Sequence, residues 1–102
     1  MEKYKQWDIW LARIKFEDAP QTKVRPVLIL GSNIFVILAS KITSQGKHLN
    51  SYAIKDWAEA GLAKPTFIRV DKYLELVDSD FVRKIGRLSC SDIQSLSKYY
   101  LK

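Results

Sequence analysis

The chain has 102 residues, enough for one hydrophobic core, and we expect one domain over residues 1–102. A hydrophobic content of 47% excludes a disordered chain, and a single cysteine excludes a disulfide framework. No apolar stretch approaches the ~20 residues of a membrane span, so we expect a cytoplasmic protein without membrane contact. The net charge of +6 favours a polyanion or an acidic protein as partner.

The first half of the chain predicts three strands, because three runs are rich in β-branched and aliphatic residues: Ile9–Ile14, Val27–Leu30 and Ile34–Ala39. The polar segment Lys15–Val24 predicts a loop of about ten residues between the first two. Gly31-Ser32-Asn33 predicts a tight hairpin turn. The third run is apolar on both faces, which predicts a buried central strand that continues towards Thr43.

The second half predicts three more strands after the polar loop Ser44–Asn50: Tyr52–Ile54, Thr66–Val70 and Val82–Leu88. Asp56–Gly61 predicts one helical turn, with Asp56 as N-cap, Glu59 at the capping-box position and Gly61 as terminator. We expect this turn to pack Trp57 onto the edge of the sheet.

The hydrophobic period changes at the C-terminus. Ile93, Leu96 and Tyr100 share one helical face, and Ser89 with Asp92 forms a helix start signal. Short strands at hairpin spacing, one terminal helix and no βαβ rhythm predict a mainly β (α+β) fold. We expect a small, strongly bent antiparallel β-barrel with short helical turns and a C-terminal amphipathic helix.

The ends of three apolar runs carry groups suited to phosphate chemistry. Arg25 precedes Pro26, Thr43 follows the central strand, and Arg69 and Asp71 lie two residues apart, on one face of a regular strand. Cleavage of a phosphodiester needs a base, an acid and positive charge at the phosphorane. We interpret Asp71 as the base oriented by Arg69, and Arg25 as the electrostatic stabiliser. Thr43 would donate a hydrogen bond to the phosphate.

Further residues are expected to contact the substrate: Phe16, Lys23, Ser44 and Gln45. The Ser44 hydroxyl can bind a phosphate, and Phe16 can stack on an unpaired base. Structural alternatives stay open. Arg25 can pair with an acid of the preceding loop, the Arg-x-Asp pair can be a structural ion pair, and the hydroxyl residues can simply form a turn.

The remaining reactive side chains indicate no further chemistry. A single histidine excludes a two-imidazole mechanism within one chain, and His48 lies in a polar loop as a solvated side chain. Cys90 has no histidine or second cysteine close in sequence, so a nucleophilic or metal-binding role is not expected. We therefore expect no metal and no cofactor.

The order and spacing of six segments resemble the PemK/MazF family of toxin–antitoxin ribonucleases over nearly the whole chain: Asp8–Ala12, Arg25–Leu28, Ile42–Ser44, Asp56–Leu62, Ile68–Asp71 and Ile85–Ser89. The resemblance implies an SH3-like barrel that dimerises, cleaves single-stranded RNA without metal and is silenced by an acidic antitoxin. It also implies that Arg25 and Thr43 are catalytic and that Arg69 and Asp71 supply the acid and base.

Two positions depart from the family pattern. Trp7 stands where many members have glycine before the acidic residue, which affects the entry turn. The loop before Arg25 lacks the histidine that some members carry, so Lys23, Gln21 or backbone groups would bind the substrate there. A non-catalytic binder on the same fold is the alternative function, either like the gyrase-poisoning toxins or as an RNA-binding module. Exposed strand edges predict a homodimer.

Overall fold

The computed structural model describes residues 3–15, 22–32, 37–43 and 51–100. Its elements are β1 (Asp8–Lys15), β2 (Thr22–Ser32), β3 (Ile37–Thr43), β4 (Ser51–Ala53), β5 (Phe67–Leu76), the 3₁₀ turn η1 (Asp78–Asp80), β6 (Phe81–Arg87) and α1 (Cys90–Tyr100). The chain is therefore mainly β with a C-terminal helix, which confirms the predicted fold class.

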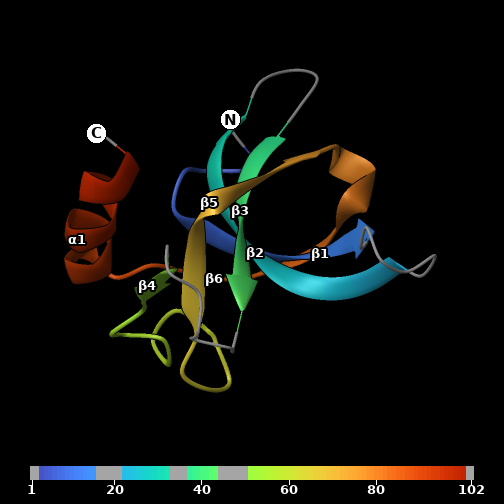
Figure 1. Cartoon of the computed structure of the whole chain (residues 1–102). Coiled ribbons are helices and arrows are strands. Elements are labelled where there is room, and N and C mark those ends of the chain that lie inside the picture. Colours follow the sequence, from blue (N-terminus) through green and yellow to red (C-terminus); the bar gives the residue numbers. More distant parts are fainter. Residues whose placement is uncertain (1–2, 16–21, 33–36, 44–50, 101–102) are drawn as a thin grey trace.

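All six strands pair antiparallel in one sheet with the order β4-β5-β3-β2-β1-β6. Register shifts interrupt three of the pairings, β1 with β6, β2 with β3 and β3 with β5. Such bulges bend the strands, and Figure 1 shows the sheet curling round, with α1 beside β4 at one side. Among the described strands no pairing joins β4 to β6, so the hydrogen-bonded ladder itself is open.

The two faces of the bent sheet bury different sets of side chains. The first cluster comprises Tyr4, Trp10, Ala12, Ile14, Val27, Ile29 and Leu76. The second cluster comprises Ile9, Leu28, Ile42, Tyr52, Ile54, Ala60, Ile68, Leu88 and Leu96, and so includes α1 and the segment after β4. Because Val27, Leu28 and Ile29 are all fully buried, β2 lies between the two clusters. This explains why its sequence lacks the alternation of a half-buried strand.

Strand β5 contributes side chains to both clusters because its pairing with β3 is irregular. Ser40 pairs with Tyr73 but Ile42 pairs with Ile68, so a two-residue step on β3 matches a five-residue step on β5. Because the number of additional residues on β5 is odd, side chains at even positions lie on one face of the sheet before the irregular stretch and on the other face after it. Val70 accordingly packs on the second cluster, whereas Leu74 packs on the first.

Several predicted boundaries were wrong. Gly31 and Ser32 do not form a tight turn but continue β2, paired with Leu38 and Ile37, because the bulge after Ile29 keeps the ladder going. The predicted loop between the first two strands is shorter, since β2 begins at Thr22. Asn33, residues 34–36 and the predicted loop at 44–50 lie outside the described residues.

The segment after β4 is a turn, as predicted, but without the predicted N-cap. The backbone N–H of Ala60 donates to the Asp56 carbonyl at 3.1 Å, and Gly61 adopts φ +90°, as expected of a terminator. The predicted N-cap role of Asp56 was wrong, because its carboxylate accepts instead from the Ser89 hydroxyl at 2.6 Å. Trp57 packs against the second cluster, which confirms its predicted position.

The C-terminal helix starts as predicted. The Asp92 N–H donates to the Ser89 hydroxyl at 3.2 Å, and the Ile93 N–H donates to the Ser89 carbonyl at 2.9 Å. Leu96 is fully buried on the face that meets the sheet. Within the described ranges, no helix combines the length and the apolar character needed to cross a bilayer.

Candidate active site

Three adjacent strands, β5, β3 and β2, carry the predicted catalytic positions side by side. Val27 of β2 pairs with Lys41 of β3, and continuing that register by two residues sets Arg25 opposite Thr43. Thr43 in turn pairs with Phe67 of β5, two residues before Arg69. Since neighbouring strands lie ~4.8 Å apart, Arg25 and Arg69 flank β3 at a backbone separation of roughly two strand spacings.

Arg25 and Arg69 lie on the same face of the sheet. Arg25 pairs with Ala12, a member of the first cluster, and alternates with Val24. Arg69 follows Ile68, which is buried in the second cluster, so its side chain lies on the other face, the face of Arg25. Arg25 is exposed and donates from Nη1 to the Val24 carbonyl at 3.1 Å, whereas Arg69 is half-buried.

The other predicted site residues are described in part or not at all. Thr43 and Asp71 are placed by their backbone alone, Thr43 at the end of β3 and Asp71 in the irregular stretch of β5. The faces of β5 exchange between Val70 and Leu74, so the shared face expected of Arg69 and Asp71 stays a prediction. Lys23 is exposed on β2, and the residues Phe16, Ser44 and Gln45 lie outside the described ranges.

A buried carboxylate on α1 ties the helix to β4, the strand that pairs with the part of β5 that carries Arg69. Asp92 is fully buried and accepts from the Tyr52 hydroxyl at 2.7 Å, from the Lys55 N–H at 3.0 Å and from the Asp56 N–H at 2.9 Å. Tyr52 lies in β4, where its neighbour Ser51 pairs with Arg69. The helix, the three-residue strand β4 and the turn after it are thus tied at one carboxylate.

The hydrogen bonds at Asp92 decide its charge. Burial raises the pKa of this carboxyl, but the N–H groups of Asp56 and Lys55 and the hydroxyls of Tyr52 and Ser89 outweigh it, so the pKa lies below its usual value. The resulting stabilisation is present above the pKa of an unfolded aspartate and disappears as the pH falls through the lower folded pKa. Burial and the hydrogen bond to Asp92 raise the pKa of Tyr52 to about 12.

A second buried carboxylate fixes the start of the sheet. Asp8 is 1% exposed and forms ion pairs with Arg87 at 3.0 Å and Lys84 at 3.4 Å. The preceding Trp7 adopts φ 76°, a left-handed conformation that favours glycine. Backbone hydrogen bonds to Ile29 and from Leu88 hold it there. The position where the sequence departs from the pattern of the family it resembles therefore has a backbone conformation in which glycine would be favoured.

Sequence reasoning missed the positioning role of Asp92, which it read only as part of a helix start signal. An acid three residues after a serine cap is common and surface-exposed in most helices, so no local signal indicated burial. It also did not single out Ser51, whose buried hydroxyl oxygen finds no hydrogen-bond partner among the described residues and which lies opposite Arg69. Within the same ranges, no group of three or more His, Cys, Asp and Glu side chains is arranged to hold a metal ion.

Comparison with known proteins identifies the family of this fold. The family model for PemK-like, MazF-like toxins of type II toxin–antitoxin systems matches residues 5–99. A search of curated proteins finds no match. Several solved structures have a similar fold, and three of them are informative here.

The Mycobacterium tuberculosis toxin MazF-mt6 superposes with a TM-score of 0.71 at 24% identity, covering 90% of both chains. An Mtb toxin gives a TM-score of 0.64 at 26% identity, over 74% of this chain and 87% of that one. An endoribonuclease in complex with its cognate antitoxin, from a mycobacterial species, gives 0.71 at 10% identity, over 92% and 87%. At such low sequence identities, the similarity to the first and third structures shows only that the fold is shared.

Proposed function

This chain belongs to the PemK-like, MazF-like toxins of type II toxin–antitoxin systems, and we propose that it is a metal-independent endoribonuclease acting on single-stranded RNA. A structural neighbour that is an endoribonuclease supports this activity at the level of the fold. The observation that carries the proposal is the placement of Arg25 and Arg69 on one face of the sheet, on either side of the strand that ends at Thr43.

In the proposed reaction the 2′-oxygen of a ribose attacks the adjacent phosphorus and the bond to the 5′-oxygen breaks. The products are a 2′,3′-cyclic phosphate and a 5′-hydroxyl. Asp71 accepts the proton of the 2′-hydroxyl, and Arg69 orients Asp71. Arg25 binds the phosphate oxygens through its guanidinium fork, where negative charge increases in the phosphorane. The Thr43 hydroxyl donates a hydrogen bond to the same phosphate, and the Arg-x-Asp pair returns a proton to the leaving oxygen.

The substrate strand is proposed to contact Lys23 next to Arg25, and Phe16, Ser44 and Gln45 in the flanking loops. Lys23 is exposed, as phosphate binding requires. A phosphodiester bound at Arg25 would lie at the end of β2 that extends beyond its pairing with β3, which among the described residues reaches only to Val27. Single-stranded RNA fits such an open position better than a stacked duplex.

The test is cleavage of a long RNA by the purified protein in EDTA, with the fragment ends mapped. Wild type should leave cyclic phosphate ends, and Arg25→Ala and Asp71→Asn should each slow cleavage by about 100-fold or more. Arg13→Ala is the matched control, because Arg13 lies on the adjacent strand but on the opposite face. The proposal fails if wild type does not cut, or if both site variants cut as fast as the control.

The proposed partners are an acidic antitoxin and a second copy of the chain. The antitoxin complex of the endoribonuclease neighbour supports the first, and the net charge of +6 is complementary to it. Sedimentation at micromolar concentration should show a homodimer, and a monomer there would contradict this. The proposed compartment is the cytoplasm. A protein that inhibits gyrase supercoiling and leaves RNA intact would instead be the non-catalytic alternative.

A further inference from the structure

Ser51 has a buried hydroxyl oxygen that forms no hydrogen bond with any described residue. Within those residues, the buried side-chain polar atoms without a partner are Oγ of Ser51 and Nε1 of Trp10. Trp10 packs in the first cluster against the rings of Tyr4 and Phe81, whereas Ser51 lies on β4. A buried hydroxyl without a partner costs stability. A hydrogen bond that forms only in a complex would account for this oxygen.

Ser51 and Arg69 share one face of the sheet. The two residues are paired directly between β4 and β5. Their neighbours Tyr52 and Ile68 are also paired, and both are buried in the second cluster, so the side chains of Ser51 and Arg69 lie on the opposite face. The Cβ atoms of directly opposed residues lie ~4.5–5.5 Å apart. The guanidinium of Arg69, at the end of a long side chain, can therefore reach the serine oxygen.

Strand β4 is held in place from its other face. The hydroxyl of Tyr52, the residue after Ser51, donates to the Asp92 carboxylate at 2.7 Å, and two N–H groups of the turn that follows β4 donate to the same carboxylate. Figure 1 shows β4 between α1 and β5. Because the strand is anchored on both sides, a hydrogen bond at Ser51 would restrain Arg69 rather than displace β4.

The chemistry of the two side chains is complementary. Arg69 has five N–H donors and no acceptor, and a hydroxyl oxygen can accept through two lone pairs. The oxygen of Ser51 is buried, so a phosphate of the RNA has no direct access to it, whereas Arg69 lies directly opposite. Hydrogen bonds of catalytic groups often form fully only when the substrate binds. One N–H bound to Ser51 leaves the other donors of Arg69 for Asp71 and the phosphate.

We propose that Ser51 is a positioning residue for Arg69. In the complex with RNA, its hydroxyl oxygen accepts a hydrogen bond from the guanidinium and fixes the orientation in which Arg69 acts on Asp71 and the scissile phosphate. This inference rests on the proposed function and adds to it a residue that does not touch the RNA. A long side chain loses rotamer freedom when it is fixed, and a second anchor reduces the loss that remains at the moment of reaction. The hydroxyl therefore contributes to kcat.

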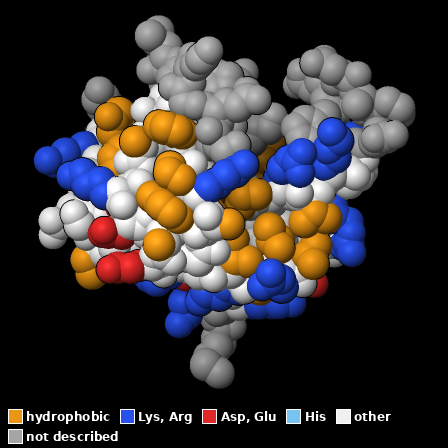
Figure 2. Space-filling view, turned by 90° about the horizontal axis from the view of Figure 1, so that it is seen from below, with side chains coloured by type: hydrophobic (Ala, Val, Ile, Leu, Met, Phe, Trp, Pro, Cys, Tyr) orange, Lys and Arg blue, Asp and Glu red, His pale blue; other side chains and the backbone are white. Residues whose placement is uncertain are grey.

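The affinity for RNA should depend little on Ser51. The net charge is +6, and Figure 2 shows Lys and Arg side chains at several places on the face that it draws. Single-stranded RNA is held by many such cations together. The test therefore separates kcat from KM for cleavage of an oligoribonucleotide in EDTA. Ser51→Ala should lower kcat about tenfold or more and change KM by less than about twofold.

Thermal unfolding distinguishes positioning from a structural role. Thr66→Val is the matched control, because the hydroxyl of buried Thr66 donates to the Lys64 carbonyl at 2.6 Å. Its loss should lower the melting temperature by about 4 °C and leave kcat within about twofold. Ser51→Ala removes an oxygen without a partner, so its melting temperature should not fall. Ser51→Thr keeps the hydroxyl and should retain most of the wild-type kcat. A lower melting temperature with unchanged kcat for Ser51→Ala would overturn the proposal.

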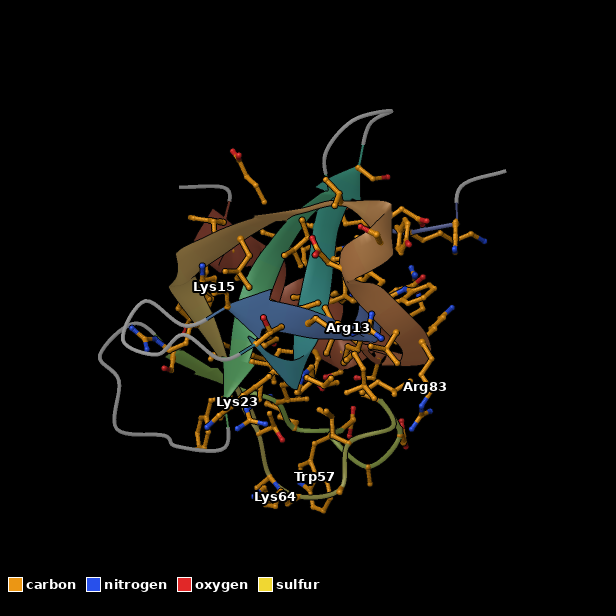
Figure 3. The ribbon with its side chains drawn as sticks, turned by 90° about the vertical axis from the view of Figure 1, so that its right-hand side faces the viewer. Arg13, Lys15, Lys23, Trp57, Lys64 and Arg83 are labelled. Atoms are coloured by element: carbon orange, nitrogen blue, oxygen red, sulfur yellow. The ribbon has the colours of Figure 1, made fainter. Side chains whose placement is uncertain are left out.

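A double-mutant cycle in single turnover identifies the partner of Ser51. In an Arg69→Ala background, Ser51→Ala should lower the rate no further, because the group that it positions is gone. In an Arg83→Ala background it should lower the rate by the same factor as in wild type. Arg83 is an exposed cation of β6, and Figure 3 shows it on the opposite side of the view from Lys23, which lies two residues before Arg25. Equal further losses in both backgrounds would overturn the proposal.

NMR follows the same hydrogen bond without cleavage. The guanidinium N–H signals of Arg69 are recorded while a 2′-O-methylated oligouridylate, which cannot be cleaved, is added. Their exchange with water should slow in wild type but not in Ser51→Ala. Slowed exchange in a wild type that does not cut RNA disproves the proposed function alone. Cleavage with equal kcat in wild type and Ser51→Ala disproves this inference alone, and neither cleavage nor a difference in exchange disproves both.

Discussion

Two regions of the molecule differ in how far their polar side chains are buried and paired: the corner where α1, β4 and the 55–62 turn meet, and the end of the β1–β2 hairpin around Thr22–Arg25. In the corner, the fully buried carboxylate of Asp92 on α1 accepts hydrogen bonds from β4 and from the turn. In the hairpin, Thr22–Arg25 are all exposed and pair only with β1 among the described strands. The comparison indicates that buried, fully paired polar groups fix the fold, whereas the cations available for binding lie where little packing depends on them.

The largest loss of stability is expected from Asp92→Ala. The change leaves the buried Tyr52 hydroxyl and two partly buried backbone N–H groups without their acceptor, which should lower the free energy of unfolding by about 3–5 kcal/mol. Urea denaturation measures it. Asp80→Ala is the control, because that carboxylate accepts from the exposed Val77 N–H and its loss should cost about 1 kcal/mol or less. Similar losses for both would contradict the contrast between the two regions.

A methyl group at Gly86 should come next. A Cβ there would collide with the carbonyl oxygen of Ala60, a backbone atom that cannot rotate aside as the end of a flexible side chain does. Gly86→Ala should therefore destabilise the protein by about 2–3 kcal/mol. Nothing lies within 4 Å of a Cβ added at Gly31, so Gly31→Ala should be neutral within about 0.5 kcal/mol. Thermal unfolding should give a lower melting temperature for Gly86→Ala than for Gly31→Ala. Equal melting temperatures would contradict the close approach of β6 to the 55–62 turn.

Tyr52→Phe tests a single hydrogen bond of the corner. It should cost about 1 kcal/mol at neutral pH, since the ring and its contact with Tyr99 are kept. Its pH dependence is more specific. The folded pKa of Tyr52 is about 12 against 10.0 for an ordinary tyrosine, so this stabilisation is complete below pH 10 and is lost between about pH 10 and 12. The difference between wild type and variant should shrink over that range, and a constant difference would argue against the bond to Asp92.

The smallest effect on stability is expected from the hairpin. Arg25→Ala removes an exposed side chain from a strand that pairs there with one described strand, so the free energy of unfolding should change by less than about 0.5 kcal/mol. Urea denaturation alongside the cleavage assay separates the two roles. A loss of more than about 2 kcal/mol would mean that Arg25 is structural, as the ion-pair interpretation of the sequence allowed.

Elements whose apolar residues recur at a regular spacing could be predicted from the sequence. The strand Ile9–Ile14 is signalled by its run of β-branched and aliphatic residues, and the helix after Ser89 by its hydrophobic period and its serine cap. The bulge that extends β2 through Gly31 was not predictable, because it depends on the pairing partner rather than on the residues themselves.

The candidate site was predictable in outline because its residues lie at strand ends, which a sheet brings together. The positions of Arg25 and Thr43 on neighbouring strands follow from hairpin order, whereas Arg69 lies beside Thr43 because β5 pairs with β3 in place of the intervening β4. The buried carboxylates that hold the surrounding elements together were not predictable. Asp92 is forty residues from Tyr52 in the sequence, and only the packed structure joins them. The same holds for Asp8 and Arg87.

The irregular stretch of β5 limits how the length of this chain can change. Here β5 advances by five residues where its partner β3 advances by two, so β5 has an odd number of extra residues. For this reason Val70 packs on the second cluster and Leu74 on the first. Deleting one residue there would make the surplus even and turn Leu74 and Leu76 towards the wrong side. Deleting two would keep both leucines buried. Related chains should therefore differ in length at this place by pairs of residues, and a natural single deletion should come with a compensating change nearby.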